Sequence, residues 1–347
     1  MTTRRARIGI ADVAEAAGVS KTSVSFAFNS PGRLSEETAA RIRVVADELG
    51  YRPDPVARML TSGETRTIGV LTPQPLAVSI SNPFFGALSE GIAAVAEASD
   101  YGVNLISPLG GSLARAVSRA TVDGIVAIGL SEDHPEIEQI RRTGLPIVLV
   151  DSTAMADQPS VSIDDQAGAQ TAAEHLVGLG HRDFLVISIV AAGSSPHTVP
   201  GDRLAGYRSA LSAAGIALTD DRVETDTSTV AGGAQAFARA WARGIRPTAV
   251  LAMSDAMAMG VIRAAAERGV GVPSDMSVVG FDDVDVSAYI NPPLTTVHQP
   301  IRRKGEEAVR LLLAAIERRA PKRDHLRLDT HLVIRASTGP APASSGR

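Results

Sequence analysis

The sequence has 347 residues, of which 44% are hydrophobic and 21% charged, with a formal net charge of −4 at pH 7. This length and composition are ordinary for a globular protein with more than one core, so two or three domains are expected. The absence of cysteine excludes disulfide and thiolate chemistry, and no apolar run approaches the roughly 18 residues of a membrane span. The N-terminus also lacks the apolar segment of a secretory signal, so we expect a cytoplasmic protein.

The first predicted elements are two short helices joined by a tight turn. Apolar residues recur at helical spacing over residues 10–17, and Gly18 is placed to end that helix. Ser20 can cap a second helix over residues 21–29. Such a helix-turn-helix reads the major groove of DNA with the N-terminal residues of its second helix. The predicted DNA-reading residues are Ser20, Lys21, Thr22, Ser23, Ser25, Phe26 and Asn29.

A third helix and a short linker segment follow. Ser35 can cap the third helix and Gly50 can end it. Asp54 and Pro55 then suit the start of a helix over residues 56–60. Isolated helices below about 12 residues are marginal, so this segment is expected to fold only when a partner arrives, with a plain linker as the alternative. The buried stripe of the third helix is expected to contain Ile42, Val45, Ala46 and Leu49.

From Thr67 onward, strand-like apolar runs alternate with helical stretches. This pattern favours parallel sheets covered by helices on both faces. The strand–helix units are more numerous than one sheet accommodates, so two α/β lobes are expected. The strands are predicted at residues 68–71, 103–106, 124–128, 147–150, 184–189, 250–253 and 278–281. The helices are predicted at residues 84–98, 136–142, 166–179, 204–214, 233–243 and 256–268.

A set of short motifs occurs in a fixed order along the chain. The runs DVAEAAGVSKTSVS, SEETAARI, ADELGYRPDPVARML and IGVLTP are followed by GHR, GYRSAL, SDAMAMG, VVGFDD and PPLTTVHQP. Together they resemble the lactose-repressor (LacI) family of bacterial transcription regulators over nearly the whole chain. The resemblance implies a helix-turn-helix head and a bilobed α/β core like that of a periplasmic sugar-binding protein. It also implies a homodimer that binds palindromic operator DNA and a small-molecule effector, most often a carbohydrate, without a cofactor.

The resemblance also implies domain boundaries. Residues 1–52 are expected to form the head, 53–65 the hinge helix and linker, and 66–337 the core. Within the core, the N-lobe is expected to take residues 66–163 and 294–322, and the C-lobe residues 164–293 and 323–337. The remaining segment, 338–347, is rich in small residues, Pro and Gly, and is expected to be disordered.

The family resemblance adds two expectations about DNA contacts. The hinge helices of two subunits are expected to order together in the minor groove, with Val56 and Ala57 against DNA and Leu60 wedged between base pairs. In the second helix of the head, Phe26 stands where relatives carry a base-contacting arginine. Phenylalanine can touch a thymine methyl or turn inward, so the operator should differ from that of arginine-bearing relatives.

Candidates for the effector site follow the carboxyl ends of strands, where open α/β sheets bind ligands. By resemblance, Arg203 opens a helix and holds ligand hydroxyls or a carboxylate, Asp282 accepts hydrogen bonds from the ligand, and aromatic contact comes from Phe84 and Phe85. Asp255 is expected to cap the following helix instead. The predicted effector-binding residues are Phe84, Phe85, Asp151, Arg203, Ser254 and Asp282.

The sequence offers no motif for catalysis or metal binding. It has neither a GxGxxG after a strand nor a GxxxxGK[ST] or HExxH motif, and its seven histidines show no ligand spacing. We therefore expect no enzyme activity, no cofactor and no metal. Two alternatives to a sugar-responsive repressor stay open at this point. One is a periplasmic-type sugar-binding protein without a regulatory role, and the other is a nucleobase-responsive regulator.

Overall fold

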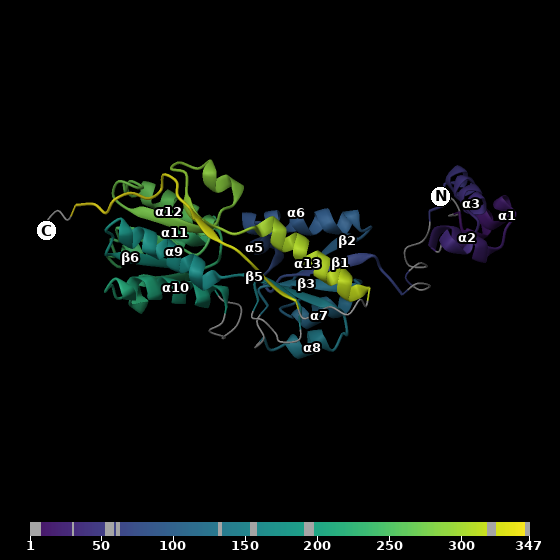
Figure 1. Cartoon of the computed structure of the whole chain (residues 1–347), viewed down its shortest axis with the longest axis horizontal. Helices are drawn as coiled ribbons and strands as arrows, with labels where there is room; N and C mark the ends of the chain where they lie inside the picture. Colours follow the sequence, from purple (N-terminus) through teal and green to yellow (C-terminus); the bar gives the residue numbers. More distant parts are fainter. Residues whose placement is uncertain are drawn as a thin grey trace, which may run out of the picture. The chain divides into compact units, whose positions relative to one another are not determined.

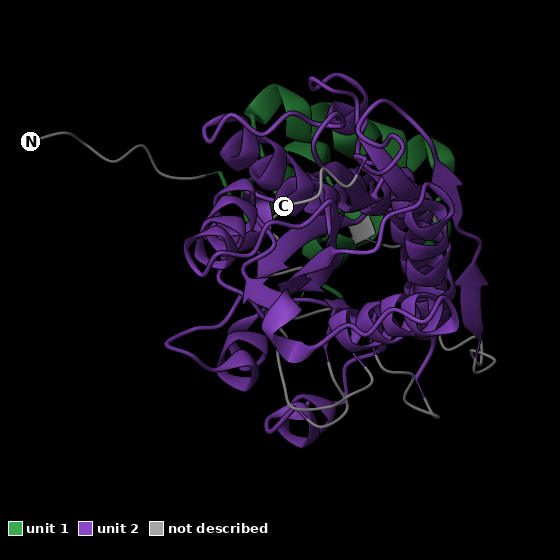
Figure 2. Ribbon diagram, turned by 90° about the vertical axis from the view of Figure 1, so that its left-hand side faces the viewer, with its two compact units in different colours: residues 1–66 green, residues 67–347 purple. Residues whose placement is uncertain are grey.

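The computed structural model describes residues 8–29, 31–52, 59, 63–130, 134–152, 158–190, 198–317 and 324–343. The chain divides into two compact units, Met1–Arg66 and Thr67–Arg347, coloured green and purple in Figure 2. Within the described ranges, no helix is long and apolar enough to cross a membrane.

The first unit contains α1 (Ile10–Ala17), α2 (Lys21–Asn29), a 3₁₀ turn (Pro31–Arg33) and α3 (Glu36–Leu49). α1 ends at Gly18, whose φ of 64° lies in the left-handed region that glycine adopts without strain. The Ser20 hydroxyl accepts a hydrogen bond from the Ser23 amide at the start of α2, and the Ser35 hydroxyl accepts one from the Thr38 amide at the start of α3. These caps confirm the helix starts predicted from the sequence.

The core of the first unit is a small apolar cluster between the three helices. It contains Val13, Ala14, Ala17, Val24, Ala27, Ala39, Ile42 and Ala46. Val45 packs against this cluster, but Leu49 is 36% exposed, so the prediction that Leu49 is buried is wrong. α3 ends at Leu49, and Tyr51, which follows the helix, packs against this cluster. The ring centroids of Tyr51 and Phe28 lie 5.9 Å apart.

The second unit is built on two six-stranded sheets, one in each lobe. The N-lobe sheet has the order β11-β5-β4-β3-β1-β2, with β1 (Thr67–Leu71), β2 (Gly102–Ile106), β3 (Gly124–Ile128), β4 (Ile147–Val150), β5 (Ser160–Ile163) and β11 (His325–Leu328). The C-lobe sheet has the order β12-β10-β9-β8-β6-β7, with β6 (Phe184–Ile189), β7 (Val223–Asp226), β8 (Ala249–Ala252), β9 (Ser277–Asp282), β10 (Thr295–His298) and β12 (His331–Val333). All these strand pairs are parallel except β10 with β12.

Helices cover both sheets. The N-lobe carries α5 (Leu76–Ile80), α6 (Pro83–Ala98), α7 (Leu113–Arg119), α8 (Ile137–Arg141) and α13 (Ile301–Ile316). The C-lobe carries α9 (Asp165–Gly178), α10 (Val199–Ala213), α11 (Val230–Ala242) and α12 (Asp255–Ala266). α6 packs against α13 and α9 against α10 (Figure 1). These pairs approach closely, because a Cβ added at Gly91 or Gly206 would lie 1.9 or 2.1 Å from a backbone carbonyl oxygen of the facing helix.

Two strands lie in the lobe opposite to the one predicted. β10 pairs with β9 in the C-lobe, although its residues were assigned to the N-lobe, and β11 pairs with β5 in the N-lobe, although it was assigned to the C-lobe. The chain therefore crosses between β5 and α9, between β10 and α13, and between β11 and β12. Both misplaced strands are short and rich in polar residues, so only their pairing with distant strands defines the sheet to which they belong.

The prediction that residues 338–347 are disordered is wrong for the first part of that segment. The Thr338 hydroxyl lies 3.0 Å from Nε2 of His175, and the Gly339 amide donates a hydrogen bond to the Ser277 hydroxyl. These residues attach to the C-lobe through polar contacts. The prediction of disorder rested on the lack of an apolar stripe, and a segment held by hydrogen bonds does not need one. The final four residues lie outside the described part of the chain.

Candidate functional site

A pocket between the two lobes lies at the carboxyl ends of the strands, as the sheet pattern predicts. The N-lobe side includes Thr72 and Gln74 after β1, Leu130 after β3, and Ser152 after β4. All six residues predicted to bind an effector line this pocket. Lining residues that the sequence did not single out are Thr72, Pro73, Gln74, Asn82, Ile128, Gly129, Leu130, Ser152, Ile189, Val190, Thr198, Val199, Pro200 and Ser228.

Arg203 is buried in the C-lobe wall of the pocket and is 4% exposed. Its Nε donates to Asp165 at 2.8 Å, and its Nη1 donates to the Met253 carbonyl and lies 3.8 Å from Asp282. The guanidinium stacks 3.5 Å from the centroid of the Phe281 ring. α10 begins at Val199 rather than at the predicted residue 204, so Arg203 lies within the helix instead of opening it.

Asp282 ends β9 at the floor of the pocket. Its φ of 126° lies outside the region that side-chain-bearing residues prefer, a strain often found where a side chain must be aimed at a ligand. Its carboxylate accepts a hydrogen bond of 2.6 Å from Gln299 Nε2. Burial raises the pKa of Asp282 to about 7, and the nearby Arg203 and the Gln299 hydrogen bond limit that rise.

Asp151 directly follows β4 on the N-lobe side and has a φ of 49°. Its carboxylate pairs with Lys304 Nζ at 2.5 Å, and the same Nζ donates to Oε1 of Gln299. Lys304 lies on α13 and is fully buried. The contacts therefore run from Asp151 through Lys304 and Gln299 to Asp282, and link the N-lobe to the C-lobe behind the pocket.

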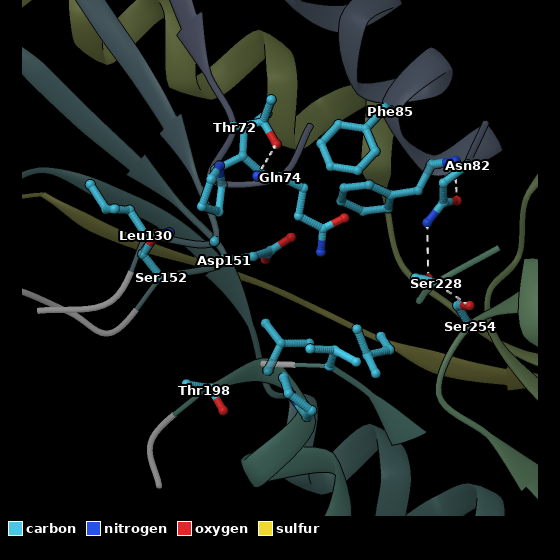
Figure 3. Close-up of a pocket in the computed structure, with 18 of the residues that line it drawn as sticks. Thr72, Gln74, Asn82, Phe85, Leu130, Asp151, Ser152, Thr198, Ser228 and Ser254 are labelled. Carbon is cyan, nitrogen blue, oxygen red and sulfur yellow. Dashed lines mark hydrogen bonds between the residues drawn. The ribbon is translucent and has the colours of Figure 1, made fainter. Parts of the chain in front are cut away.

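A second polar chain joins the lobes at the pocket wall (Figure 3). Asn82 Nδ2 donates to the Ser228 hydroxyl at 3.0 Å, and Ser228 donates to the Ser254 hydroxyl at 2.9 Å. Ser254 caps α12 by accepting from the Met257 amide, so the prediction that Asp255 is the cap is wrong.

Asp255 is instead a fully buried carboxylate beneath the pocket. It accepts hydrogen bonds from the Val284 amide at 2.9 Å and from the Thr296 hydroxyl at 2.5 Å. Burial, and next the charge of Asp282, raise the pKa of Asp255 well above its ordinary value. Its carboxylate thus fixes the loop after β9 to α12 from below the pocket.

The aromatic side of the pocket comes from the start of α6. Asn82 caps this helix by accepting from the Phe84 amide, and the rings of Phe84 and Phe85 meet edge to face with centroids 5.5 Å apart. Figure 3 shows Phe85, Gln74 and Asp151 directed toward the same space. The pocket therefore offers an aromatic wall beside hydrogen-bonding groups.

Sequence reasoning missed Lys304 and Gln299. Lys304 lies on the buried face of the amphipathic helix α13. Burying a lysine without a partner costs free energy, so a lysine at this position could have indicated a buried ion pair. Gln299 lies in the motif PPLTTVHQP, immediately after β10. Its function as a bridge becomes visible only once both lobes are in place.

The exposed face of α2 provides the candidate DNA surface of the first unit. Ser20, Lys21 and Thr22 are exposed, while Ser23, Ser25 and Phe26 are half-buried. The Arg33 guanidinium lies 5.2 Å from the Phe26 ring centroid. The side chain of Asn29 and the hinge residues Val56, Ala57 and Leu60 lie outside the described residues.

Comparison with known proteins yields matches to both parts of the chain. Residues 9–54 match bacterial regulatory proteins of the lacI family, and residues 173–338 match a periplasmic binding protein-like domain. The transcriptional repressor PurR of Vibrio campbellii is 32% identical over 339 residues, covering 94% of this chain and 97% of PurR. The lac repressor dimer bound to operator and the anti-inducer ONPF matches with a TM-score of 0.80 and 28% identity, over 96% of this chain and 99% of that one. A complex of the regulator CelR with cellobiose matches with a TM-score of 0.70 and 28% identity, over 95% of this chain and 100% of that one.

A helix-turn-helix head on a bilobed core with a pocket between its lobes defines the class of effector-controlled DNA-binding regulators. Within that class, the chain belongs to the lacI family of bacterial regulatory proteins. It is a DNA-binding transcriptional repressor regulated by effector binding, and the relatives that it matches are regulators rather than enzymes.

Proposed function

We propose that this repressor acts as a homodimer on an inverted-repeat operator, and that a small carbohydrate bound between the lobes controls its operator affinity. The observation that carries the effector proposal is the convergence of Asp151, Arg203 and Asp282 on one pocket beside Phe85. Carboxylate and guanidinium groups suit the paired donors and acceptors of a sugar's hydroxyls, and the apolar face of a sugar ring packs on an aromatic wall.

The proposed control rests on the separation of these groups between the lobes. Asp151 belongs to the N-lobe, and Arg203 and Asp282 belong to the C-lobe. A ligand that contacts both sides binds best when the lobes are close together, so it favours the closed arrangement of the core. Closure changes the distance between the N-terminal ends of two core domains in a dimer, and with it the folding of the short hinge at residues 56–60.

Two findings support a carbohydrate as the effector class. The pocket is lined by polar groups and by two phenylalanines, and the related CelR is seen in complex with cellobiose. A nucleobase is the second candidate, because Phe84, Phe85 and Val190 provide apolar surface that suits a flat heterocycle.

A thermal-shift screen of sugars, nucleobases and nucleosides, repeated with Arg203→Ala, tests the proposal. A ligand at 100 times its dissociation constant stabilises the protein by about 2.7 kcal/mol. The proposal predicts that a sugar stabilises the natural protein, that Arg203→Ala abolishes this shift, and that the sugar changes operator affinity. A nucleobase that stabilises the natural protein, loses this effect in Arg203→Ala and changes operator affinity establishes the second candidate. A shift that survives in Arg203→Ala contradicts the proposed site.

A further inference from the structure

Phe26 lies on the DNA-reading face of α2 and does not turn into the head. It follows Thr22 by one helical turn, so the two side chains share the face of α2 that is opposite to the buried Val24. Of the two phenylalanines in α2, Phe28 packs against the described apolar cluster of the head, whereas Phe26 does not. The structure therefore shows the outward of the two positions that phenylalanine can take here.

The guanidinium of Arg33 lies over the Phe26 ring. Arg33 belongs to the 3₁₀ turn that follows α2, and its Cζ lies 5.2 Å from the ring centroid, within the range of a cation–π contact. Arg33 is also exposed, and a guanidinium that stacks on a ring can still donate two parallel hydrogen bonds from its edge. The reading face of α2 thus carries a positioned arginine, although α2 itself contains none.

The two side chains suit features of the major groove. Guanine presents its O6 and N7 acceptors to the paired N–H groups of a guanidinium, and thymine presents a methyl group that an aromatic ring can contact. Phosphates lie along the backbone, whereas the N-terminal residues of the second helix are directed at base edges. Because Phe26 lies on that face of α2 and holds the guanidinium there, a base edge is the partner that Arg33 fits. Stacking also lowers the side-chain entropy that Arg33 loses on binding.

We infer that Arg33 is a further base-reading residue of this repressor, that it binds a guanine in each operator half-site, and that Phe26 positions it for this contact. A bidentate contact of this kind discriminates guanine from another base about 5- to 150-fold in one half-site. The inference takes only the two half-sites from the proposed function. It depends neither on the effector nor on the pocket between the lobes.

The test begins with the full chain and a DNA duplex library randomised over about 20 base pairs, enough for two half-sites, with no symmetry imposed. Sites selected by the natural protein should carry a guanine at one fixed position in each half. Sites selected by Arg33→Ala should accept any base at that position and keep the other preferences. Replacing the guanine by adenine in one half-site should weaken binding of the natural protein about 5- to 150-fold and leave that of Arg33→Ala nearly unchanged. Selected sites without such a guanine overturn the inference.

Substitution of 7-deazaguanine for this guanine tests the contact itself, because this base lacks the N7 acceptor and still pairs with cytosine. The natural protein should bind the modified site about tenfold more weakly, and Arg33→Ala should bind both sites equally. Equal binding of both sites by the natural protein would refute a bidentate contact with guanine. A sensitivity to 7-deazaguanine that persists in Arg33→Ala would assign the contact to another residue.

Two further substitutions separate base reading from charge. Arg33→Lys keeps the charge and loses the paired donors, so it should lose the guanine preference. Arg41→Ala removes an exposed charge from α3 and should leave the guanine preference unchanged, whatever its effect on total affinity. If Arg33→Ala instead weakens binding to all sites equally and lowers the salt dependence, Arg33 contacts a phosphate and the inference is wrong.

The positioning by Phe26 has its own pair of variants. Phe26→Tyr keeps the ring and should keep the guanine preference, whereas Phe26→Leu keeps an apolar side chain without a ring and should lower the preference toward that of Arg33→Ala. Equal guanine preference in these two variants would contradict positioning by the ring. A selected site without two-fold symmetry would contradict the proposed operator, whereas the guanine test applies to that site unchanged.

Discussion

Asp282 should make the stability of the protein depend on pH near neutrality. Its carboxyl is buried at the pocket floor, and its pKa is raised from an ordinary 3.8 to about 7. Between these two values the folded state holds a proton that the unfolded state has released. Stability due to this group is therefore fully present below about pH 4 and is lost as the pH rises through 7.

The expected magnitude follows from linkage. While the folded state holds one more proton than the unfolded state, the free energy of unfolding falls by about 1.4 kcal/mol per pH unit. Between pH 5 and pH 8, a shift from 3.8 to about 7 amounts to roughly 2 to 3 kcal/mol. Burial of His175 and His181 lowers their pKa values, so these histidines act in the opposite direction below about pH 6.5.

Comparison with Asp282→Asn reports on this carboxyl together with its effect on Asp255, whose pKa the charge of Asp282 raises, because the asparagine does not titrate and the histidines are common to both proteins. Urea unfolding at pH 5, 6, 7 and 8 gives the free energy of unfolding of each. The natural protein should lose roughly 2 to 3 kcal/mol more than the variant between pH 5 and pH 8. Parallel pH profiles for the two proteins would refute a proton held by Asp282 in the folded state.

Three further predictions concern the DNA surface, the hinge and the helix packing. Lys21→Ala should relax base preference within each operator half-site by about 1 to 3 kcal/mol, measured by competition among variant operators; unchanged preference would remove Lys21 from the reading surface. Leu60→Ala should weaken operator binding in fluorescence anisotropy while effector affinity of the free protein stays the same; unaltered operator affinity would exclude a leucine wedge. Gly91→Ala places a Cβ 1.9 Å from the Arg302 carbonyl and should destabilise the fold by about 1 to 3 kcal/mol in urea unfolding. Gly86→Ala on the same helix places its Cβ in open space and should leave the stability unchanged. Equal effects of the two substitutions would contradict the close approach of α6 and α13.

The central strands of both lobes could be predicted from the sequence within one residue at each end. β3, β4 and β6 are continuous apolar runs because helices cover both faces of a parallel sheet. β10 and β11 could not be predicted in this way. Their sequences, TTVH and HLRL, have no such run, and β11 is identified by pairing with β5, which lies far away in the sequence.

In the pocket too, some residues could be predicted from the local sequence pattern, whereas others depend on contacts between distant parts of the chain. Asp151 and Asp282 directly follow or end apolar strands, so their position at the carboxyl edge was predictable from the strand pattern together with the family resemblance. Lys304 and Gln299 come from a helix and a crossing between lobes. Their contacts with the two aspartates depend on how the lobes pack, and no local pattern encodes that packing.

Operator affinity measured with and without the effector is the direct test of control from the pocket between the lobes. Fluorescence anisotropy of a selected operator, with and without a saturating amount of the sugar that stabilises the protein, gives the coupling between pocket and DNA. Control from the pocket predicts that operator affinity changes about 5- to 150-fold and that sugar affinity changes by the same factor when operator is bound. In Arg203→Ala, neither affinity should change. Equal operator affinity with and without the sugar, or an unchanged response in Arg203→Ala, would contradict control from the pocket between the lobes.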